Sequence, residues 1–221
     1  MKSEEFFREV DEDLQRDRLA ALWRRYGWFV IALAVAVVVG TAGGEAWRAW
    51  QQRSMQAEAA RYEAAVQGLD ADPAAAAGRL DAFARDSRSG YGQLARLREA
   101  QAKMAAKDEA GAVAALQTLA DDRSADPLVR DLASLLVAER TIDTGDPAAL
   151  KARLEPLAAA GAPYRLTARE LQALLDLRTG DAASARKRLE DLSREVGLPQ
   201  QQEQRVKQLL ASLGAEGTDK P

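Results

Sequence analysis

The sequence contains no cysteine and no histidine, and these two absences exclude several kinds of chemistry. Without cysteine the chain can form no disulfide, thiol nucleophile or thiolate metal site. Without histidine it lacks the commonest general base and the commonest transition-metal ligand. Serine hydrolases with a histidine base, zinc proteases and zinc deaminases are therefore excluded. Glycine (15) and proline (7) are too few for a low-complexity or collagen-like chain.

The chain also lacks a large charge of either sign. It has 31 Lys plus Arg against 34 Asp plus Glu, a formal net charge of −3. Nucleic-acid-binding proteins normally carry a basic excess, so we expect no nucleic-acid partner. Alanine, leucine, arginine and glutamate dominate the 221 residues, and all four favour helix. The composition predicts an all-α protein.

Residues 26–44 form a long apolar run, with 19 residues free of charge between Arg25 and Glu45. As a helix the run would measure roughly 28 Å, which is close to the thickness of the hydrocarbon core of a bilayer. Aromatic residues that suit the headgroup interface flank it on both sides: Trp23, Tyr26, Trp28, Trp47 and Trp50. A buried helix of a soluble protein is the alternative, which the β-branched run Val37–Val39 disfavours. The pattern predicts a single transmembrane helix over residues 26–46.

A cleaved signal peptide is a second alternative for this run. The 25 residues before it are long and acidic for the first region of a signal peptide, and Gly40-Thr41-Ala42 is a poor cleavage site. We therefore expect an uncleaved signal anchor.

The cations beside the span predict its orientation. Four arginines precede it and two follow it within fifteen residues: Arg16, Arg18, Arg24 and Arg25 against Arg48 and Arg53. This bias favours a cytoplasmic N-terminus. The large C-terminal part would then lie outside the cytoplasm, in the periplasm if the protein is bacterial, with the anchor in the inner (cytoplasmic) membrane.

Two further patterns lie in or near the anchor. Residues 1–25 carry one apolar helical stripe, made by Phe6, Phe7, Val10 and Leu14. The stripe fits a cytoplasmic amphipathic helix lying on the inner leaflet, or a docking helix for a cytoplasmic or membrane partner. Within the span, Gly40 and Gly44 have the spacing that lets two helices approach closely, so self-association is a hypothesis.

The remainder of the chain is an internal repeat marked by four aspartates. Asp72, Asp108, Asp146 and Asp181 are separated by 36, 38 and 35 residues. Each has the position of a helix N-cap, where its carboxylate can accept a hydrogen bond from an unpaired amide. Apolar residues recur at offsets 4, 8 and 11 from each aspartate, on one face of the helix that follows: Ala76, Leu80, Phe83, Ala112, Leu116, Leu119, Leu150, Leu154, Leu157, Ala185, Leu189 and Leu192.

The helix before each aspartate is marked by an alanine eight residues upstream, at Ala64, Ala100, Ala138 and Ala173. Thr144-Gly145-Asp146 and Thr179-Gly180-Asp181 are nearly identical, with glycine placed to end the preceding helix. The pattern therefore predicts that each repeat consists of a first helix, a tight turn at the aspartate and a second helix.

This pattern resembles the tetratricopeptide repeat, although the aromatic residues typical of its first helix are mostly absent and Pro156 lies late in a second helix. The resemblance implies an α-solenoid of four helix pairs over residues 47–214 behind the single transmembrane helix. Residues 200–213 read as a terminal helix that covers the last pair. The polar residues 215–221 are expected to be a disordered tail.

The whole layout is similar to the YfgM-type family. The stretch from Val10 to Gln51 and the segment Gly90-Tyr91-Gly92-Gln93-Leu94-Ala95 carry this similarity. The resemblance implies an ancillary subunit of the SecYEG translocon that hands exported proteins to a periplasmic chaperone. A scaffold for another cell-envelope assembly is the alternative.

Five residues of the first helices are left unexplained by the core pattern and are candidates for partner binding: Tyr91, Arg98, Arg130, Tyr164 and Arg165. Stacked helix pairs offer a curved face that can hold a peptide or a helix. The alternative is that the tyrosines serve local packing and that the arginines form a solvated face.

An enzyme is the third hypothesis, and it rests only on the acidic pairs Asp121-Asp122 and Glu190-Asp191. Adjacent carboxylates on a helix point to different sides, so neither pair predicts acid–base or metal chemistry. We expect a non-catalytic protein without cofactor, metal or small-molecule substrate, whose contacts are with other proteins and the lipid bilayer.

The predicted orientation can be tested with a single introduced thiol, because the chain has no cysteine of its own. A Gln200→Cys variant in intact cells should react with a maleimide that crosses the outer but not the inner membrane. Labelling only after the inner membrane is opened would reverse the topology.

Overall fold

The computed structural model describes the backbone of residues 2–87 and 89–216, and their side chains except those of 2–22, Tyr26, Val30, Ala34, Ala215 and Glu216. In this part of the chain the only regular secondary structure is helical, which confirms the all-α prediction. The helices are α1 (Lys2–Val66), α2 (Pro73–Asp86), α3 (Gly90–Ala105), α4 (Glu109–Asp121), α5 (Pro127–Arg140), α6 (Pro147–Leu157), α7 (Arg165–Arg178), α8 (Ala182–Ser193) and α9 (Gln200–Glu216).

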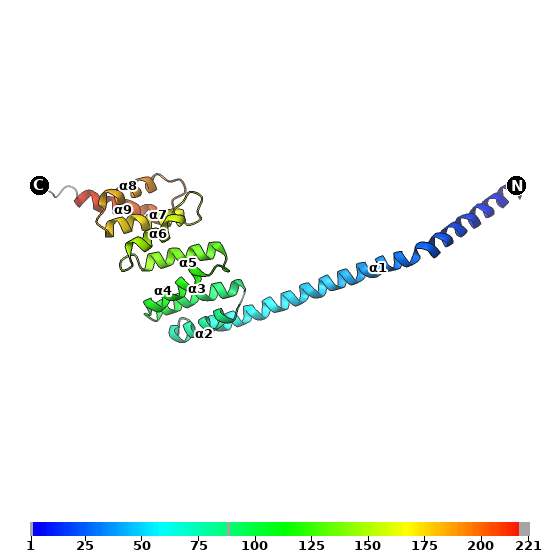
Figure 1. Cartoon of the computed structure of the whole chain (residues 1–221), viewed down its shortest axis with the longest axis horizontal. Coiled ribbons are helices and arrows are strands. Elements are labelled where there is room, and N and C mark those ends of the chain that lie inside the picture. Colours follow the sequence, from blue (N-terminus) through cyan, green and yellow to red (C-terminus); the bar gives the residue numbers. More distant parts are fainter. Residues whose placement is uncertain (1, 88, 217–221) are drawn as a thin grey trace. The chain divides into compact units, whose positions relative to one another are not determined.

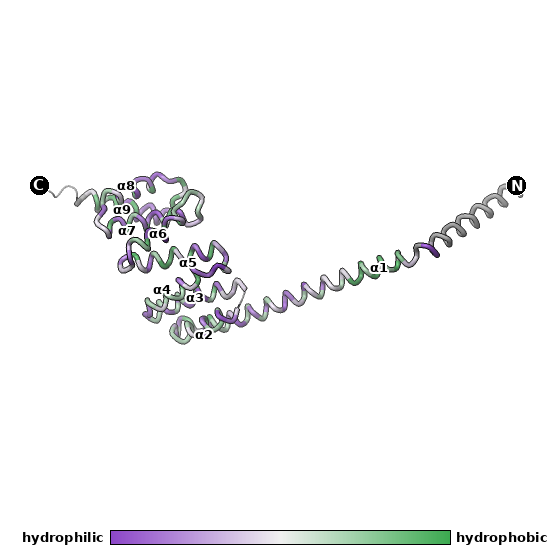
Figure 2. The backbone as a smooth tube through the Cα atoms, viewed as in Figure 1, coloured by the Kyte–Doolittle hydropathy of each residue, from purple (hydrophilic) through white to green (hydrophobic). Residues whose placement is uncertain are grey.

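The chain divides into two compact units, residues 1–57 and 58–221. The first unit holds most of α1, whose apolar stretch is flanked by hydrophilic segments in Figure 2. The predicted apolar stripe at Phe6, Phe7, Val10 and Leu14 lies outside the described side chains, as does Tyr26. The second unit contains the end of α1 and helices α2–α9, and the consecutive helices from α2 to α9 pack side by side (Figure 1).

The four aspartates cap the second helices as the repeat predicts. Asp72, Asp108, Asp146 and Asp181 are the N-caps of α2, α4, α6 and α8, and each side chain accepts from the backbone amide three residues later. These hydrogen bonds measure 2.9–3.0 Å and satisfy amides that have no partner within the helix. Asp126 caps the first helix α5 by accepting from the Leu128 amide at 2.8 Å.

The residues at offsets 4, 8 and 11 form the core of the stack. All twelve are buried, at 0–6% exposure. Each hydrophobic cluster draws on two or three consecutive helices: the first on α1, α2 and α3, and the last on α7, α8 and α9. The core is therefore a row of small clusters in which each helix pair relies on its neighbours, as in other repeat proteins.

The first pair departs from the predicted register by one residue. Ala64 is exposed, and Ala65 takes its expected place in the core at 6% exposure. The turn after α1 passes through Gly68 in the left-handed region, at φ 76°. At the other three pairs the predicted alanines, Ala100, Ala138 and Ala173, are buried.

The two Thr-Gly-Asp segments end their helices differently. Gly180 adopts φ 83° directly after α7, and the Asp181 amide donates to the Asp176 carbonyl at 2.8 Å, which completes a Schellman motif. α5 instead ends at Arg140, so the expectation that Gly145 ends this helix is wrong. Gly145 lies in the turn that follows, where a Cβ would come within 2.9 Å of the Thr141 carbonyl oxygen.

The last helix, α9, extends into the segment that the sequence predicts to be a disordered tail. α9 runs to Glu216, so the backbone of the first two tail residues is helical, and residues 217–221 lie outside the described part of the chain. On its inner face α9 buries Val206 and Leu213 against α7 and α8, as expected of a helix that covers the last pair.

The turn between α3 and α4 contains a residue with a strained backbone, and a glycine at this position would remove the strain. Lys107 adopts φ 63° in a Schellman motif that is otherwise the same as the one at Gly180. A left-handed conformation costs a non-glycine residue about 1–2 kcal/mol, and glycine gives part of this back as entropy of the unfolded chain. Lys107→Gly should raise the free energy of unfolding by about 0.5–1 kcal/mol, measured by denaturant unfolding in detergent.

The matched control is Ala106→Gly, one residue earlier, where φ is −79°. It should lower the free energy of unfolding by about 0.5–1 kcal/mol, because glycine brings only its entropic cost there. Equal effects of the two substitutions would contradict a strain confined to Lys107.

Candidate interaction surfaces

The first unit exposes a long apolar surface on α1. Its large apolar side chains between residues 28 and 50 are more than half exposed: Trp28, Phe29, Ile31, Leu33, Val35, Val37, Val38, Val39, Trp47 and Trp50. A soluble protein rarely exposes a continuous patch of this size. The segment is long and apolar enough to cross a membrane. Within it the Thr41 hydroxyl donates to the Val37 carbonyl at 2.9 Å, so this polar group has a partner inside the helix.

The tryptophans predicted to flank the anchor are exposed, and their contact with lipid stays a prediction. Trp23 is exposed at 62%, before the apolar run, and the Trp47 and Trp50 rings lie 5.3 Å apart after it. A Cβ added at Gly40 or Gly44 would meet no atom within 4 Å, so both glycines are open to contact. Nothing within the described chain covers this surface.

An aromatic cluster joins the end of α1 to α2 and α3. The Tyr62 ring lies 5.9 Å from Phe83 and 5.5 Å from Tyr91, and the Arg61 guanidinium lies 5.6 Å from the centre of the Phe83 ring. Tyr62 and Tyr91 line a shallow groove of about 730 Å³ together with alanines of α1. Tyr91, a predicted contact residue, is therefore partly packed and partly on a groove wall.

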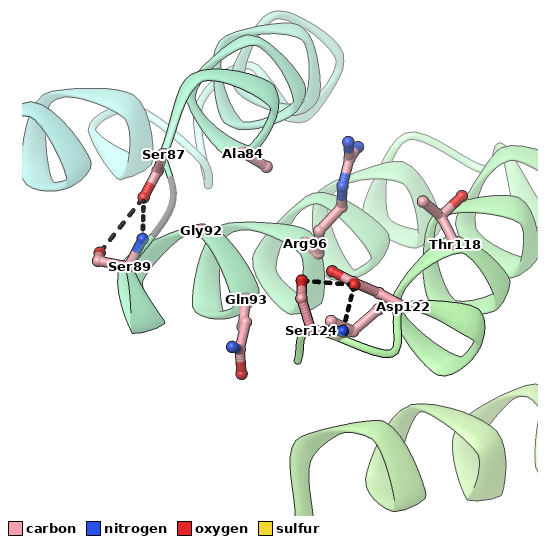
Figure 3. Close-up of a pocket in the computed structure, with 10 residues that line it drawn as sticks. Ala84, Ser87, Ser89, Gly92, Gln93, Arg96, Thr118, Asp122 and Ser124 are labelled. Atoms are coloured by element: carbon pink, nitrogen blue, oxygen red, sulfur yellow. Dashed lines mark hydrogen bonds between the residues drawn. The ribbon is translucent and has the colours of Figure 1, made fainter. Parts of the chain in front are cut away.

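A pocket of about 520 Å³ lies between α2, α3 and α4. Figure 3 shows the residues that line it, several of which are polar. Several of its polar groups already form hydrogen bonds that hold the local backbone. Ser89 caps α3 by accepting from the Tyr91 amide, and Asp122 accepts from the Ser124 hydroxyl at 2.6 Å and the Ser124 amide at 2.8 Å. These two bonds lower the pKa of the Asp122 carboxyl. The arrangement holds two turns and presents no pair of groups placed for acid–base chemistry.

Arg96 reaches this pocket from a buried ion cluster. Its Nη1 lies 2.7 Å from Asp81 Oδ1 and 2.8 Å from Glu99 Oε2, and Lys103 Nζ lies 2.7 Å from Glu99 Oε1. Burial opposes the charge of Arg96, but the hydrogen bonds and charges of the two carboxylates outweigh it and raise the Arg96 pKa. Glu99 is only 1% exposed, so the two cations compensate an otherwise costly buried charge.

A second ion pair ties the terminal helix to the stack. Glu170 of α7 is 5% exposed, and Arg205 of α9 donates to its two carboxylate oxygens at 2.8 and 3.1 Å. These bonds raise the pKa of Arg205. The sequence pattern did not reveal Glu99 or Glu170, because an acidic residue on a predicted helix is normally assigned to its solvated face. Glu99 does occupy a repeated position, because it lies nine residues before the capping Asp108, as Gln172 lies nine residues before Asp181. Both of these polar residues are buried, so the repeat register was the available signal for Glu99.

The structure separates the other predicted contact residues. Arg98 is exposed and donates to Gln101 Oε1 at 2.7 Å, and Arg130 is half-buried in α5. Tyr164 is the N-cap of α7 without a side-chain cap bond, and it packs against the cluster of α5, α6 and α7. Burial raises the pKa of the Tyr164 phenol. Of the five residues, only Tyr91 lines one of the grooves above.

Arg165 takes part in a three-residue ion cluster instead. Its Nη1 lies 2.7 Å from Glu195 Oε1 in the loop between α8 and α9, and Arg169 Nη1 lies 2.5 Å from the same oxygen. The hydrogen bond from Arg165 and the charges of both arginines lower the pKa of Glu195. Arg165 thus fixes a loop onto α7.

Among the described residues, no group of three Asp or Glu side chains is placed to hold a metal ion. Of the acidic pairs considered from the sequence, Asp122 belongs to the turn at Ser124, and Asp191 lies 3.6 Å from Arg194.

Comparison with known proteins adds one relationship. Residues 21–214 match the family described as a tetratricopeptide repeat-like domain. No curated protein matches the chain. No solved structure matches it either.

The Glu195 cluster predicts a pH dependence of stability. Because the folded-state pKa of Glu195 lies below its ordinary value of 4.5, its ion pairs stabilise the fold above that value. This stabilisation is lost as the pH falls through the folded-state pKa. The difference in melting temperature between the parent and Glu195→Gln should therefore be largest near neutral pH and vanish in acid.

The control uses the two arginines that lower this pKa. In an Arg165→Gln, Arg169→Gln background, Glu195→Gln should no longer change how the melting temperature varies with pH. A persistent pH-dependent difference there would assign the effect to other partners of Glu195.

Proposed function

The chain belongs to the tetratricopeptide repeat-like domain family, and on this premise we propose that it is a membrane-tethered protein-interaction scaffold without catalytic activity. Domains of this type mediate protein–protein contacts and are typically non-catalytic. The observation that carries the proposal is the extent of the family match. It begins at residue 21, before the apolar run, and ends at residue 214, so one family unit includes both the tether and the stack.

The scaffold works by holding partners close to a membrane. An anchored domain meets its membrane-bound partners at a higher effective concentration than a free one, which strengthens weak contacts without new interactions. The row of interlocked clusters supplies a stack whose surface residues keep fixed positions. We assign residues 1–25 to a cytoplasmic segment, 26–46 to the anchor, 47–214 to the repeat domain and 215–221 to a tail.

We place the anchor in the bacterial inner membrane with the repeat domain in the periplasm. The excess of arginine before the apolar run supports this orientation. The resemblance to the YfgM-type family supports a role as an ancillary SecYEG subunit that assists the hand-over of exported proteins to a periplasmic chaperone. Among the predicted contact residues, Arg98 of α3 is exposed and Tyr91 lines a groove, and we propose that these two touch a partner.

Affinity purification of the tagged full-length chain from bacterial membranes in a mild detergent tests this proposal. Translocon components and a periplasmic folding factor should co-purify with it. Enrichment of a different envelope complex would overturn the translocon assignment and favour a scaffold for that assembly. Recovery of no protein partner, including after chemical cross-linking, would overturn the scaffold itself.

Control variants separate tethering from partner binding. Lysine at the centre of a spanning helix costs about 2.5–3.5 kcal/mol of insertion free energy, so Val35→Lys with Val38→Lys should release the chain in a carbonate wash. The matched Ala36→Leu variant should stay in the membrane and keep its partners. Release of the parent chain by carbonate would contradict the anchor.

A further inference from the structure

A groove of about 610 Å³ crosses the stack at α5, α7 and α9, and we call it the α5–α9 groove. Its floor is apolar and comes from Ile142, Leu171, Leu174 and Leu209. Ile142 and Leu174 pack against the cluster of α5–α7, whereas Leu209 packs against the cluster of α7–α9. The groove therefore lies where two core clusters meet, and it offers a depression in which an apolar side chain of a partner can be buried.

The rim of this groove carries a carboxylate without an ion pair. Glu139 at the end of α5 is exposed and has no side-chain hydrogen bond or ion pair within the described chain. Arg205 also lines the groove, but both its short contacts are with Glu170, and Glu139 acts on it only as a more distant charge. Arg205 and Glu170 neutralise each other, which leaves the charge of Glu139.

Glu139 is shared with a second groove of about 750 Å³ between α4 and α5. Two more carboxylates without an ion pair in the described chain, Glu109 and Asp143, line it, together with one cation, Arg140. Arg178 lies near this turn, but it donates to the carbonyls of Ile142 and Gly145 and lines neither groove. The two grooves together form an apolar depression continued by an acidic strip.

We propose that the α5–α9 groove binds a short partner segment in which a leucine-sized apolar side chain lies next to lysine or arginine residues. The apolar side chain enters the depression at Leu174, and the cations face Glu139 and the acidic strip. Charge complementarity selects this occupant, because an acidic segment would be repelled by the same rim. The assignment rests on the proposed scaffold role and names the chemistry of a partner.

Three labelled peptides test the assignment, with the full-length protein in a non-ionic detergent and fluorescence anisotropy as the measurement. The first is a Ser/Gly peptide with a central Leu-Lys-Lys, the second has Leu-Glu-Glu and the third has Ser-Lys-Lys. The Leu-Lys-Lys peptide should bind most tightly, and its affinity should fall with salt. Equal or tighter binding of the Leu-Glu-Glu peptide would overturn the proposal.

Charge variants on the rim show whether the groove is responsible. Glu139→Lys should weaken binding of the Leu-Lys-Lys peptide by about two- to fivefold or more, because it removes one exposed ion pair and places a like charge beside the peptide lysines. Arg140→Glu should tighten it. The matched control is Asp70→Lys, at an exposed aspartate that lines neither groove, and it should change binding little. Equal weakening by Glu139→Lys and Asp70→Lys would reduce the effect to overall charge and overturn the groove assignment.

A steric variant tests the depression itself. Thr167 of α7 lines the groove, so Thr167→Trp should fill it and abolish binding, whereas Thr167→Ser should leave binding unchanged. Unchanged binding by a Thr167→Trp protein that melts like its parent would overturn the proposal. If that variant does not fold, the exposed rim variants Glu139→Lys and Arg140→Glu still test the groove assignment.

The peptide and purification experiments fail independently. If Glu139→Lys and Thr167→Trp still recover every membrane partner and no peptide binds, the scaffold stands and the groove assignment falls. If no partner is recovered and no peptide binds, both fall.

Discussion

The burial of a leucine at the same place in each second helix is the constraint on which the stack depends. These four side chains are at most 1% exposed: Leu80, Leu116, Leu154 and Leu189. Full burial of one leucine contributes about 1.5–3 kcal/mol, but a helix pair alone cannot cover both of its faces. Each pair therefore becomes stable only against its neighbours. The turns, the terminal helix and the grooves are consequences of this mutual coverage.

Polar interactions then decide how neighbouring pairs are joined. Arg178 of α7 donates to two carbonyls of the α5–α6 turn, and Arg205 of α9 holds the buried Glu170 of α7. Such directional contacts fix the relative position of neighbouring helices, which the apolar packing of alanines and leucines defines less strictly. They also use up most of the arginines that could otherwise recognise a ligand. Glu139, Glu109 and Asp143 are among the charged residues that these ion pairs leave without a partner in the described chain, and the proposed groove uses them.

The two units of the chain differ in where their apolar residues lie. In the first unit large apolar residues are exposed, and the hydroxyl of Thr41, near the end of the apolar run, bonds within its own helix. In the second unit most large apolar residues are buried, with Leu94, Leu128 and Val196 as exposed exceptions, and polar groups cap the helices. A chain with both patterns suits a boundary between lipid and water, and this supports the proposal of a scaffold held at a membrane.

The sequence by itself determined the helix pairs, because their signals are local. A capping aspartate acts on an amide three residues away, and offsets of 4, 8 and 11 describe one helix face, so both were readable without knowing the fold. The register at Ala64 and the end of α5 were not, because a turn's path depends on the surfaces it connects. Only the tertiary structure decided that Glu99 and Glu170 are buried and where the α5–α9 groove lies. Glu170 meets Arg205 across 35 residues of sequence, a contact that arises only when the terminal helix packs on the last helix pair.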